Sequence, residues 1–315
     1  MKNHTFRQLL TLLNCPNCLG NLKKDQHSLR CCKCQNKWEI NNGVICLLHH
    51  SHKIVRNELD GIEQLDREGG LDVFDNEYKQ AYLNLPNFPD KGKFSHDENY
   101  FWEVAIGKKN FNKVKKSIGS GKIVLEIGAD LCWASYQLAR KNNFVIALDI
   151  NSAHLQRANY LSRRSYFTKI QGDMINLPIR DESIDVVLGI ASIHHSSNLN
   201  KTFREFARVL KSGGRLILLR EPVRGEKTDE KNFGINEKKY GINEHAPTLK
   251  QWQEALKKAG FGFSAEIARL SFLTGKFKAD KALRVVKRAF LALPLAGRYL
   301  AKHTITDYNF YAIKE

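Results

Sequence analysis

The order of apolar runs and helical stretches after Lys122 constrains the fold of this 315-residue chain more than any other feature. Short runs rich in β-branched residues alternate with amphipathic stretches, which is typical of a mainly parallel sheet covered on both faces. The expected strands are Ile123 to Ile127, Phe144 to Asp149, Phe167 to Gln171, Ile184 to Ile190, Arg215 to Glu221, Phe263 to Leu270 and Thr306 to Lys314. The expected helices are Ala134 to Lys141, Ala153 to Arg163, Asn200 to Leu210 and Leu249 to Ala259. The pattern predicts an α/β fold with a seven-stranded, mainly parallel, doubly wound Rossmann-like sheet.

Cysteines near the N-terminus form two Cys-x-x-Cys pairs, Cys15 with Cys18 and Cys31 with Cys34. This spacing lets two short turns bring four thiolates around one tetrahedral zinc ion. Cys32 could replace Cys31 as a ligand, but the paired spacing favours Cys31. Four cysteine ligands leave no position for water, so we expect residues 1–50 to form a small zinc ribbon with a structural Zn²⁺.

The N-terminal sequence resembles a known ribbon in its cysteine strings, in the leucine before the second pair and in the Trp38-Glu-Ile run. It is the ribbon of the small activator protein that partners tRNA methyltransferases, and a similar one precedes some bacterial rRNA guanine methyltransferases. The resemblance covers residues 12–48. It implies zinc strongly and RNA only weakly, because ribbons of this kind also serve as adaptors.

Residues 51–119 mix acidic and aromatic positions without a repeat, and we expect a linker and cap helices there. The region after it, 120–315, contains strings that carry a second resemblance. They are Val124-Leu-Glu126-Ile-Gly128, Asp149 at the end of the second expected strand, Gly172-Asp173-Met174, and the run from Phe203 to the double glycine Gly213-Gly214. In this order they resemble the class I S-adenosylmethionine-dependent methyltransferases, in particular the methyltransferase type 11 domain.

The resemblance implies an S-adenosylmethionine site at the carboxyl ends of the strands. The turn at Gly128 would meet the methionine part, Asp149 the ribose hydroxyls and Asp173 the adenine amino group. Trp102 is a candidate to cover the cofactor from the N-terminal side. The expected cofactor residues are Glu126, Gly128, Asp130, Asp149, Ile150, Asp173, Met174 and Trp102.

Two positions depart from the family's acid-x-Gly-x-Gly-x-Gly turn, because Asp130 and Cys132 replace its second and third glycines. The aspartate adds a negative charge that would attract the sulfonium of the cofactor and repel its carboxylate. We predict that the cofactor binds, with a degenerate fold used for scaffolding as the alternative.

Polar residues after the fourth and fifth strands are candidates for catalysis. Methyl transfer mainly requires that donor and acceptor be held in line, and a general base helps when the acceptor is a hydroxyl or an acidic nitrogen. His194 and His195 follow the fourth strand, and Glu244 and His245 lie in the connection after the fifth. Glu244 and His245 could act as an orienting acid and a base. Packing roles for the histidines and a capping role for Glu244 are the alternatives.

The net charge of +17 favours an anionic partner, such as RNA, a phospholipid surface or a phosphorylated glycan precursor. The excess is strongest in residues 276–302, inside an amphipathic insertion of about residues 271–303, and a solvated basic helix is the simpler alternative. The chain shows neither an apolar run long enough to span a bilayer nor a secretory signal. We expect a cytoplasmic protein, with peripheral attachment at the inner membrane surface as an alternative.

The leading interpretation is a methyltransferase that acts on a small-molecule, glycan or lipid-linked acceptor. The first alternative is an rRNA or tRNA methyltransferase that holds the phosphate backbone with the ribbon and the basic insertion. The second is a scaffold protein without catalysis. The motifs describe the donor side of the site, so they leave the acceptor, the methylated atom and the oligomeric state open.

Overall fold

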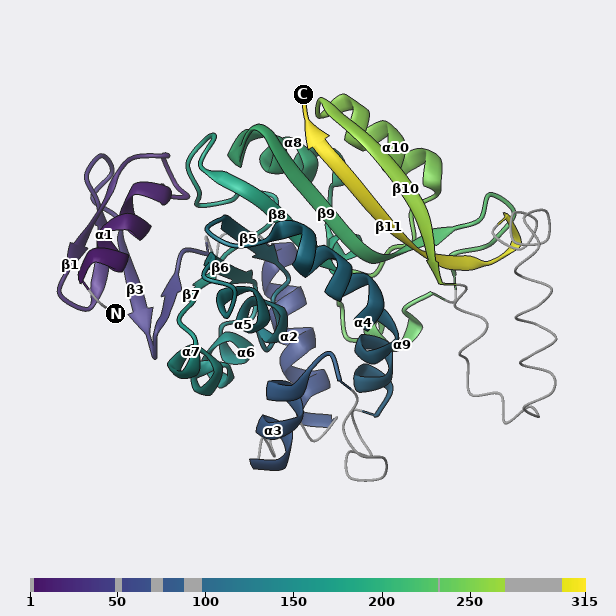
Figure 1. Cartoon of the computed structure of the whole chain (residues 1–315), viewed down its shortest axis with the longest axis horizontal. Coiled ribbons are helices and arrows are strands. Elements are labelled where there is room, and N and C mark those ends of the chain that lie inside the picture. The colour runs from purple at the N-terminus through teal and green to yellow at the C-terminus, as the bar shows by residue number, and fades with distance from the viewer. Residues whose placement is uncertain (1–2, 49–52, 69–75, 88–97, 232, 270–301) are drawn as a thin grey trace.

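The computed structural model describes residues 3–48, 53–68, 76–87, 98–231, 233–269 and 302–315. Within them, one mixed sheet of 11 strands has the order β1-β2-β3-β4-β7-β6-β5-β8-β9-β11-β10 (Figure 1). The strands are β1 (Leu22–Asp25), β2 (Ser28–Cys31), β3 (Lys37–Asn41), β4 (Val44–Cys46), β5 (Ile123–Ile127), β6 (Phe144–Asp149), β7 (Thr168–Gln171), β8 (Ile184–Ile190), β9 (Leu210–Arg224), β10 (Phe261–Arg269) and β11 (Ile305–Lys314). The helices are α1 (Asn3–Leu12), α2 (Lys53–Glu68), α3 (Asn76–Asn84), α4 (Glu98–Ile118), α5 (Trp133–Ala139), α6 (Ser152–Arg157), α7 (Asn159–Arg164), α8 (Leu199–Val209), α9 (Ile235–Lys238) and α10 (Leu249–Lys258), with a 3-10 turn η1 (Ile193–His195).

The predicted α/β fold with a mainly parallel central sheet is confirmed, but the predicted number of seven strands is too low for the sheet as a whole. Strands β5 to β8 pair in parallel, β8 pairs in parallel with β9, and β11 lies antiparallel between β9 and β10. The additional strands β1 to β4 come from the N-terminal region that the sequence suggested was a separate ribbon. Strands β1 to β4 pair with their neighbours in sequence, and β4 alone pairs with a distant strand, β7. The residues of β4 do not reveal that partner, so the prediction did not include these strands in the main sheet.

The N-terminal four-cysteine module, residues 3–48, joins the central sheet through β4. Ile45 pairs in parallel with Ile170 of β7, and the amide of Leu47 donates to the carbonyl of Gln171 at 2.9 Å. This pairing covers the edge that β7 would otherwise expose. Leu29 and Ile45 also belong to the same buried cluster as the central strands, so the module and the sheet share one core.

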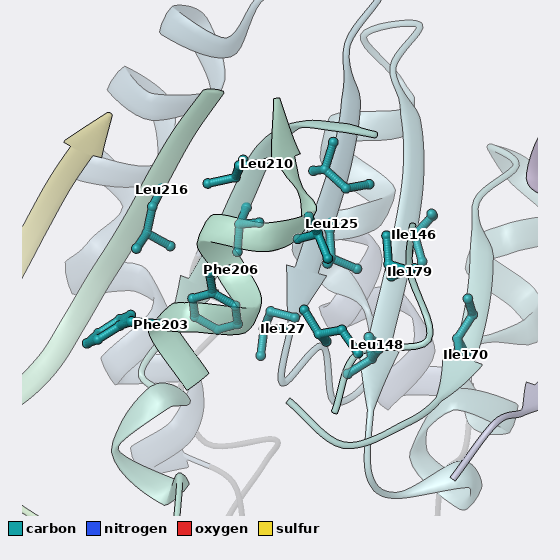
Figure 2. Packing of buried hydrophobic residues seen from close by; sticks show 14 of the residues in the cluster. Leu125, Ile127, Ile146, Leu148, Ile170, Ile179, Phe203, Phe206, Leu210 and Leu216 are labelled. Carbon is teal, nitrogen blue, oxygen red and sulfur yellow. The ribbon is translucent and has the colours of Figure 1, made fainter. Parts of the chain in front are cut away.

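The apolar residues of the central strands alternate between two buried clusters, as the period of two in a strand requires. On one face, Leu125 and Ile127 of β5 meet Phe203 and Phe206 of α8, and Figure 2 shows these side chains together. On the other face, residues of the same strands pack against α4, α5 and α7. Both faces are thus covered, which explains why these strands are nearly continuous apolar runs.

Several boundaries differ from the predicted ones. The single helix expected from Ala153 to Arg163 is two helices, α6 and α7, which divide at Ala158. Strand β9 begins at Leu210, before the double glycine. The basic segment 276–302 lies outside the described residues except at Lys302, as does most of the predicted insertion 271–303. No helix in the described part of the chain has the length and apolarity that crossing a bilayer requires.

Candidate cofactor and acceptor site

A cavity of about 520 Å³ opens where β5, β6, β7 and β8 end. Parallel strands leave a crevice at their carboxyl ends, which is where open α/β sheets bind ligands. Helix α2 contributes part of the opposite wall through Val55, Glu58, Ile62 and Leu65. The predicted cofactor residues in the wall are Glu126, Gly128, Asp130, Asp149, Ile150, Asp173 and Met174. Trp102 lies in α4, but its side chain is outside the described residues.

The turn after β5 keeps a glycine-type backbone although two of its three glycine positions are occupied by other residues. The φ angles of Gly128, Asp130 and Cys132 are 65°, 47° and 60°, all in the left-handed region. A Cβ atom at Gly128 would lie 2.4 Å from the Cβ of Ser192. Asp130 and Cys132 tolerate the same backbone conformation, so it is the close packing of Ser192, which follows β8, that requires glycine at position 128.

The charge of Asp130 is paired. Its carboxylate lies 2.6 Å from Nδ1 of His154, and Nε2 of the same ring lies 2.7 Å from Asp66 of α2. Burial would lower the pKa of His154, but the carboxylates of Asp130 and Asp66 together raise the pKa to about 10. His154 is thus a cation at neutral pH, offsets the charge that Asp130 brings to the turn, and ties α2 to the sheet.

Two further carboxyl groups lie under the turn. Asp149 accepts hydrogen bonds from the amides of Asp130 and Asn151, each at 2.8 Å, and burial raises its pKa. Glu126 accepts a hydrogen bond from the hydroxyl of Ser135, and burial raises its pKa to about 8. Each oxygen of Asp149 has one backbone partner, so each retains a lone pair that can accept a ligand hydroxyl.

The loop after β7 forms another wall, and the four-cysteine module contacts its outer side. Asp173 accepts a hydrogen bond from the amide of Ile175 at 3.0 Å. Three residues farther along, the side-chain amide of Asn176 donates to the carbonyl of Pro16 at 3.2 Å, and the amide of Asn14 donates to Pro178 at 3.0 Å. The module therefore supports the loop that carries Asp173.

Beyond β8, a buried glutamate fixes the conformation of η1 through hydrogen bonds. Glu221, 0% exposed, accepts hydrogen bonds from the amides of Ser192, Ile193 and His194, and lies 2.9 Å from Nδ1 of His194. Burial opposes protonation of His194, but Glu221 and then Glu244 raise its pKa. His194 is held behind the wall, and its Nε2 points to Glu244 at 3.6 Å.

His195 and Glu244 line the cavity itself. Nδ1 of His195 lies 2.8 Å from the carbonyl oxygen of Asn243, and its Nε2 lies 3.6 Å from Glu244. Because a carbonyl only accepts, the proton of a neutral His195 is on Nδ1 and the lone pair is on Nε2. Burial and the neighbouring His194 lower the pKa of His195 to about 3, whereas burial raises the pKa of Glu244.

The predicted partnership of Glu244 with His245 does not form. His245 is 49% exposed, lies outside the cavity wall, and contacts Glu230 and Asn243. Glu244 faces His194 and His195 instead, because neighbouring residues of an extended segment point to opposite sides.

Sequence reasoning missed the contribution of α2. Glu58 of this helix lies in the cavity wall, accepts a hydrogen bond from the amide of Asn243 at 3.2 Å, and burial raises its pKa to about 8. The wall residues Val55, Glu58, Ile62 and Leu65 recur at helical spacing, so the pattern was present in the sequence. Nothing in the spacing indicates which surface that face covers.

The four predicted metal-ligating cysteines converge. Their Sγ atoms all lie within 4.8 Å of one another, with 3.7 Å between Cys15 and Cys34 and 3.4 Å between Cys18 and Cys31. A tetrahedral zinc site with Zn–S bonds of about 2.3 Å places its sulfurs about 3.8 Å apart. The donor set and its spacing thus fit one zinc ion. Cys32 is exposed, and the set contains Cys31.

The strand order β7-β6-β5-β8-β9-β11-β10, with the cavity at the strand ends and the glycine-type turn after β5, is the arrangement expected from the resemblance to class I methyltransferases. Residues 125–218 match the family model described as Methyltransferase domain. This match over residues 125–218 agrees with the expected class of domain.

Individual proteins resemble the chain over parts of their length. A sterol 24-C-methyltransferase of Clavispora lusitaniae is 25% identical over 225 residues, which are 65% of this chain and 59% of that protein. A demethylmenaquinone methyltransferase of Tropheryma whipplei is 33% identical over 103 residues, 32% of this chain and 42% of that protein. The chain thus spans about half the length of these curated relatives.

A solved structure shows the same fold. Phosphoethanolamine N-methyltransferase 2 of Haemonchus contortus, in complex with S-adenosyl-L-methionine, is 20% identical and has a TM-score of 0.50. The match covers 72% of this chain and 59% of that chain.

Proposed function

We propose that this chain transfers the methyl group of S-adenosylmethionine to a small-molecule or lipid acceptor. The observation that carries the proposal is the single cavity, which joins the residues expected to bind cofactor to the His195 and Glu244 end. A donor site that continues into a polar wall can hold an acceptor in line with the sulfonium. The bound cofactor would supply an already activated methyl group.

The cofactor end has groups suited to each part of the nucleotide. The turn at Gly128 offers its backbone to the methionine part, and Asp149 offers carboxylate oxygens to the ribose hydroxyls. Asp173 is expected to pair with the adenine amino group. Because His154 pairs with Asp130, the aspartate does not present an uncompensated charge to the methionine carboxylate.

The acceptor end favours a molecule with an apolar body and one polar reactive end. Ile242 supplies apolar wall beside Asn243 and Glu244, and His195 with Glu244 supplies the polar part, while Val55, Ile62 and Leu65 of α2 add apolar surface to the cavity as a whole. The named acceptors of the relatives, a sterol and demethylmenaquinone, are lipids. We therefore favour a lipid acceptor over a glycan.

The cavity does not favour RNA. Glu58, Glu237 and Glu244 belong to its wall and would repel a phosphate backbone wherever they are ionised. The membrane-surface alternative rests on residues 276–302, and the RNA alternative rests on them together with the ribbon. These residues lie outside the described part of the chain apart from Lys302. RNA binding that fell steeply with added salt would revive that alternative.

The proposed activity is tested by incubating the purified chain with S-adenosylmethionine and a panel of sterols and demethylated quinones, and measuring release of S-adenosylhomocysteine. Release that requires a lipid acceptor and is lost in Asp149→Ala supports the proposal. Asp60→Ala is the matched control, because Asp60 is exposed on α2. Absence of both cofactor binding and turnover of any acceptor would favour the scaffold alternative.

We also propose that Cys15, Cys18, Cys31 and Cys34 bind a structural Zn²⁺. The amides of Lys33 and Cys34 donate to Sγ of Cys31 at 3.3 and 3.4 Å, which fixes the position of this sulfur among the four. A small module of this kind gains much of its folding free energy from the metal. Elemental analysis should find zinc that is lost when Cys15 and Cys31 are replaced by serine. A wild-type module that stays folded without metal would contradict the proposal.

A further inference from the structure

We propose that His194, His195 and Glu244 form a second metal site, which binds a first-row divalent ion such as Zn²⁺ at the acceptor end of the cavity. This goes beyond the proposed methyl transfer, for which an activated donor needs no metal. The three residues come from η1 and from the connection between α9 and α10, so the fold brings them together from two distant segments.

The spacing of the donor atoms suits a shared cation better than direct hydrogen bonds. One ligand atom from each of the three residues lies within 4.8 Å of the others. Nε2 of His194 and Nε2 of His195 each lie 3.6 Å from a different oxygen of Glu244. Hydrogen bonds of this type are about 2.7 to 3.2 Å long, whereas two N or O ligands of a tetrahedral zinc are about 3.3 Å apart.

A second observation is independent of this spacing: both imidazole rings are anchored through the nitrogen that faces away from the cluster. Nδ1 of His194 pairs with the buried Glu221, and Nδ1 of His195 pairs with the carbonyl of Asn243. Metal-bound histidines almost always donate their remote N–H to a carboxylate or a backbone carbonyl in this way. The anchors fix the orientation of each ring and direct the Nε2 atoms toward Glu244.

The charges point the same way. Glu221 and Glu244 are 0% and 8% exposed, so two acidic side chains are buried around a pair of imidazoles. Two imidazoles and one carboxylate suit zinc or a neighbouring transition metal, and not Mg²⁺ or Ca²⁺, which prefer oxygen ligands.

The site would have a function because its open side faces the cavity. His195, Glu244 and the adjoining Ser196 and Ser197 are wall residues, so a coordination position not filled by protein is accessible to the acceptor. A metal there would bind an acceptor oxygen, hold it near the donor, and lower the pKa of a hydroxyl as it does for bound water. This role rests on the proposed methyl transfer, but binding of the metal does not.

The test is metal binding by the full-length chain without cofactor or acceptor. Purified protein is stripped, reloaded with Zn²⁺ and dialysed, and the metal per chain is measured. We expect two equivalents in the wild type, one in His195→Ala and in Glu244→Gln, and two in His245→Ala. His245 is the matched control because it is exposed, adjacent to Glu244 and outside the cluster.

Absorption spectra of the wild type loaded with Co²⁺ distinguish the two sites, and this measurement does not depend on the variants. The thiolate site gives an intense sulfur-to-cobalt absorption, and the second equivalent should add only the weaker bands of nitrogen and oxygen ligation. One equivalent in all four proteins, all of it thiolate-bound, would overturn the proposal. His194 would then serve only to hold η1 to Glu221, and the proposed methyltransferase activity would be unaffected.

Discussion

Replacing His154 with glutamine should destabilise the protein at neutral pH and much less at alkaline pH. Its folded pKa of about 10 exceeds the unfolded value near 6.5, so its stabilisation is complete below pH 6.5 and is lost as the pH rises toward 10. Each unit of difference between the folded and unfolded pKa corresponds to about 1.4 kcal/mol of stability. The imidazole of His154 is 14% exposed, so most of this stabilisation remains. Asp130 is 35% exposed, so solvent partly screens its attraction to His154. We expect a loss of about 3 kcal/mol at pH 7 and about 1 kcal/mol at pH 9.

The assay is urea unfolding of wild type and His154→Gln at both pH values, with His245→Gln as an exposed control. Because Glu58, Glu126 and Lys169 also have shifted pKa values near 8, only the difference between variant and wild type at each pH isolates His154. An equal loss at pH 7 and pH 9, or no loss at pH 7, would refute the account of Asp130 as a charge paired within a buried network.

Two further perturbations test the turn and the N-terminal module. Gly128→Ala should lower the free energy of unfolding by about 3 kcal/mol, since its Cβ would meet Ser192 at 2.4 Å and its φ is 65°. Denaturant unfolding measures this, and a Gly128→Ala protein as stable as the wild type would contradict it. Cys15→Ser should remove the thiolate-bound zinc. It should also weaken binding of S-adenosylhomocysteine by about 1 kcal/mol, because the carbonyl of Pro16 accepts a hydrogen bond from Asn176 in the loop that carries Asp173. Unchanged affinity after loss of that zinc, measured by elemental analysis and calorimetry, would separate the module from the cofactor site.

Local patterns predicted the central sheet well because its strands are buried on both faces. Ile123 to Ile127 and Phe144 to Asp149 have the bounds of β5 and β6. The convergence of the residues expected to bind cofactor was also predictable, because strand ends that are far apart in sequence meet at one edge of a parallel sheet. Seven of the eight lie in one cavity wall.

Contacts between distant segments could not be predicted. Val44 to Cys46 is only three residues long, and its sequence does not indicate β7, more than a hundred positions later, as its partner. The pairing of Asp130 with His154 and Asp66 likewise depends on α2 covering the turn. Adjacency in sequence was misleading for Glu244, whose partners are His194 and His195 and not His245.

The most direct test of the central claim is calorimetric titration of the full-length, metal-replete chain with S-adenosylmethionine and with S-adenosylhomocysteine. The account predicts saturable binding of both. Asp149→Ala should weaken it about 100-fold, since two charged hydrogen bonds to the ribose are lost, and Asp60→Ala should leave it unchanged. No detectable binding to the wild type, or full binding to Asp149→Ala, would contradict the assignment of this cavity as the cofactor site.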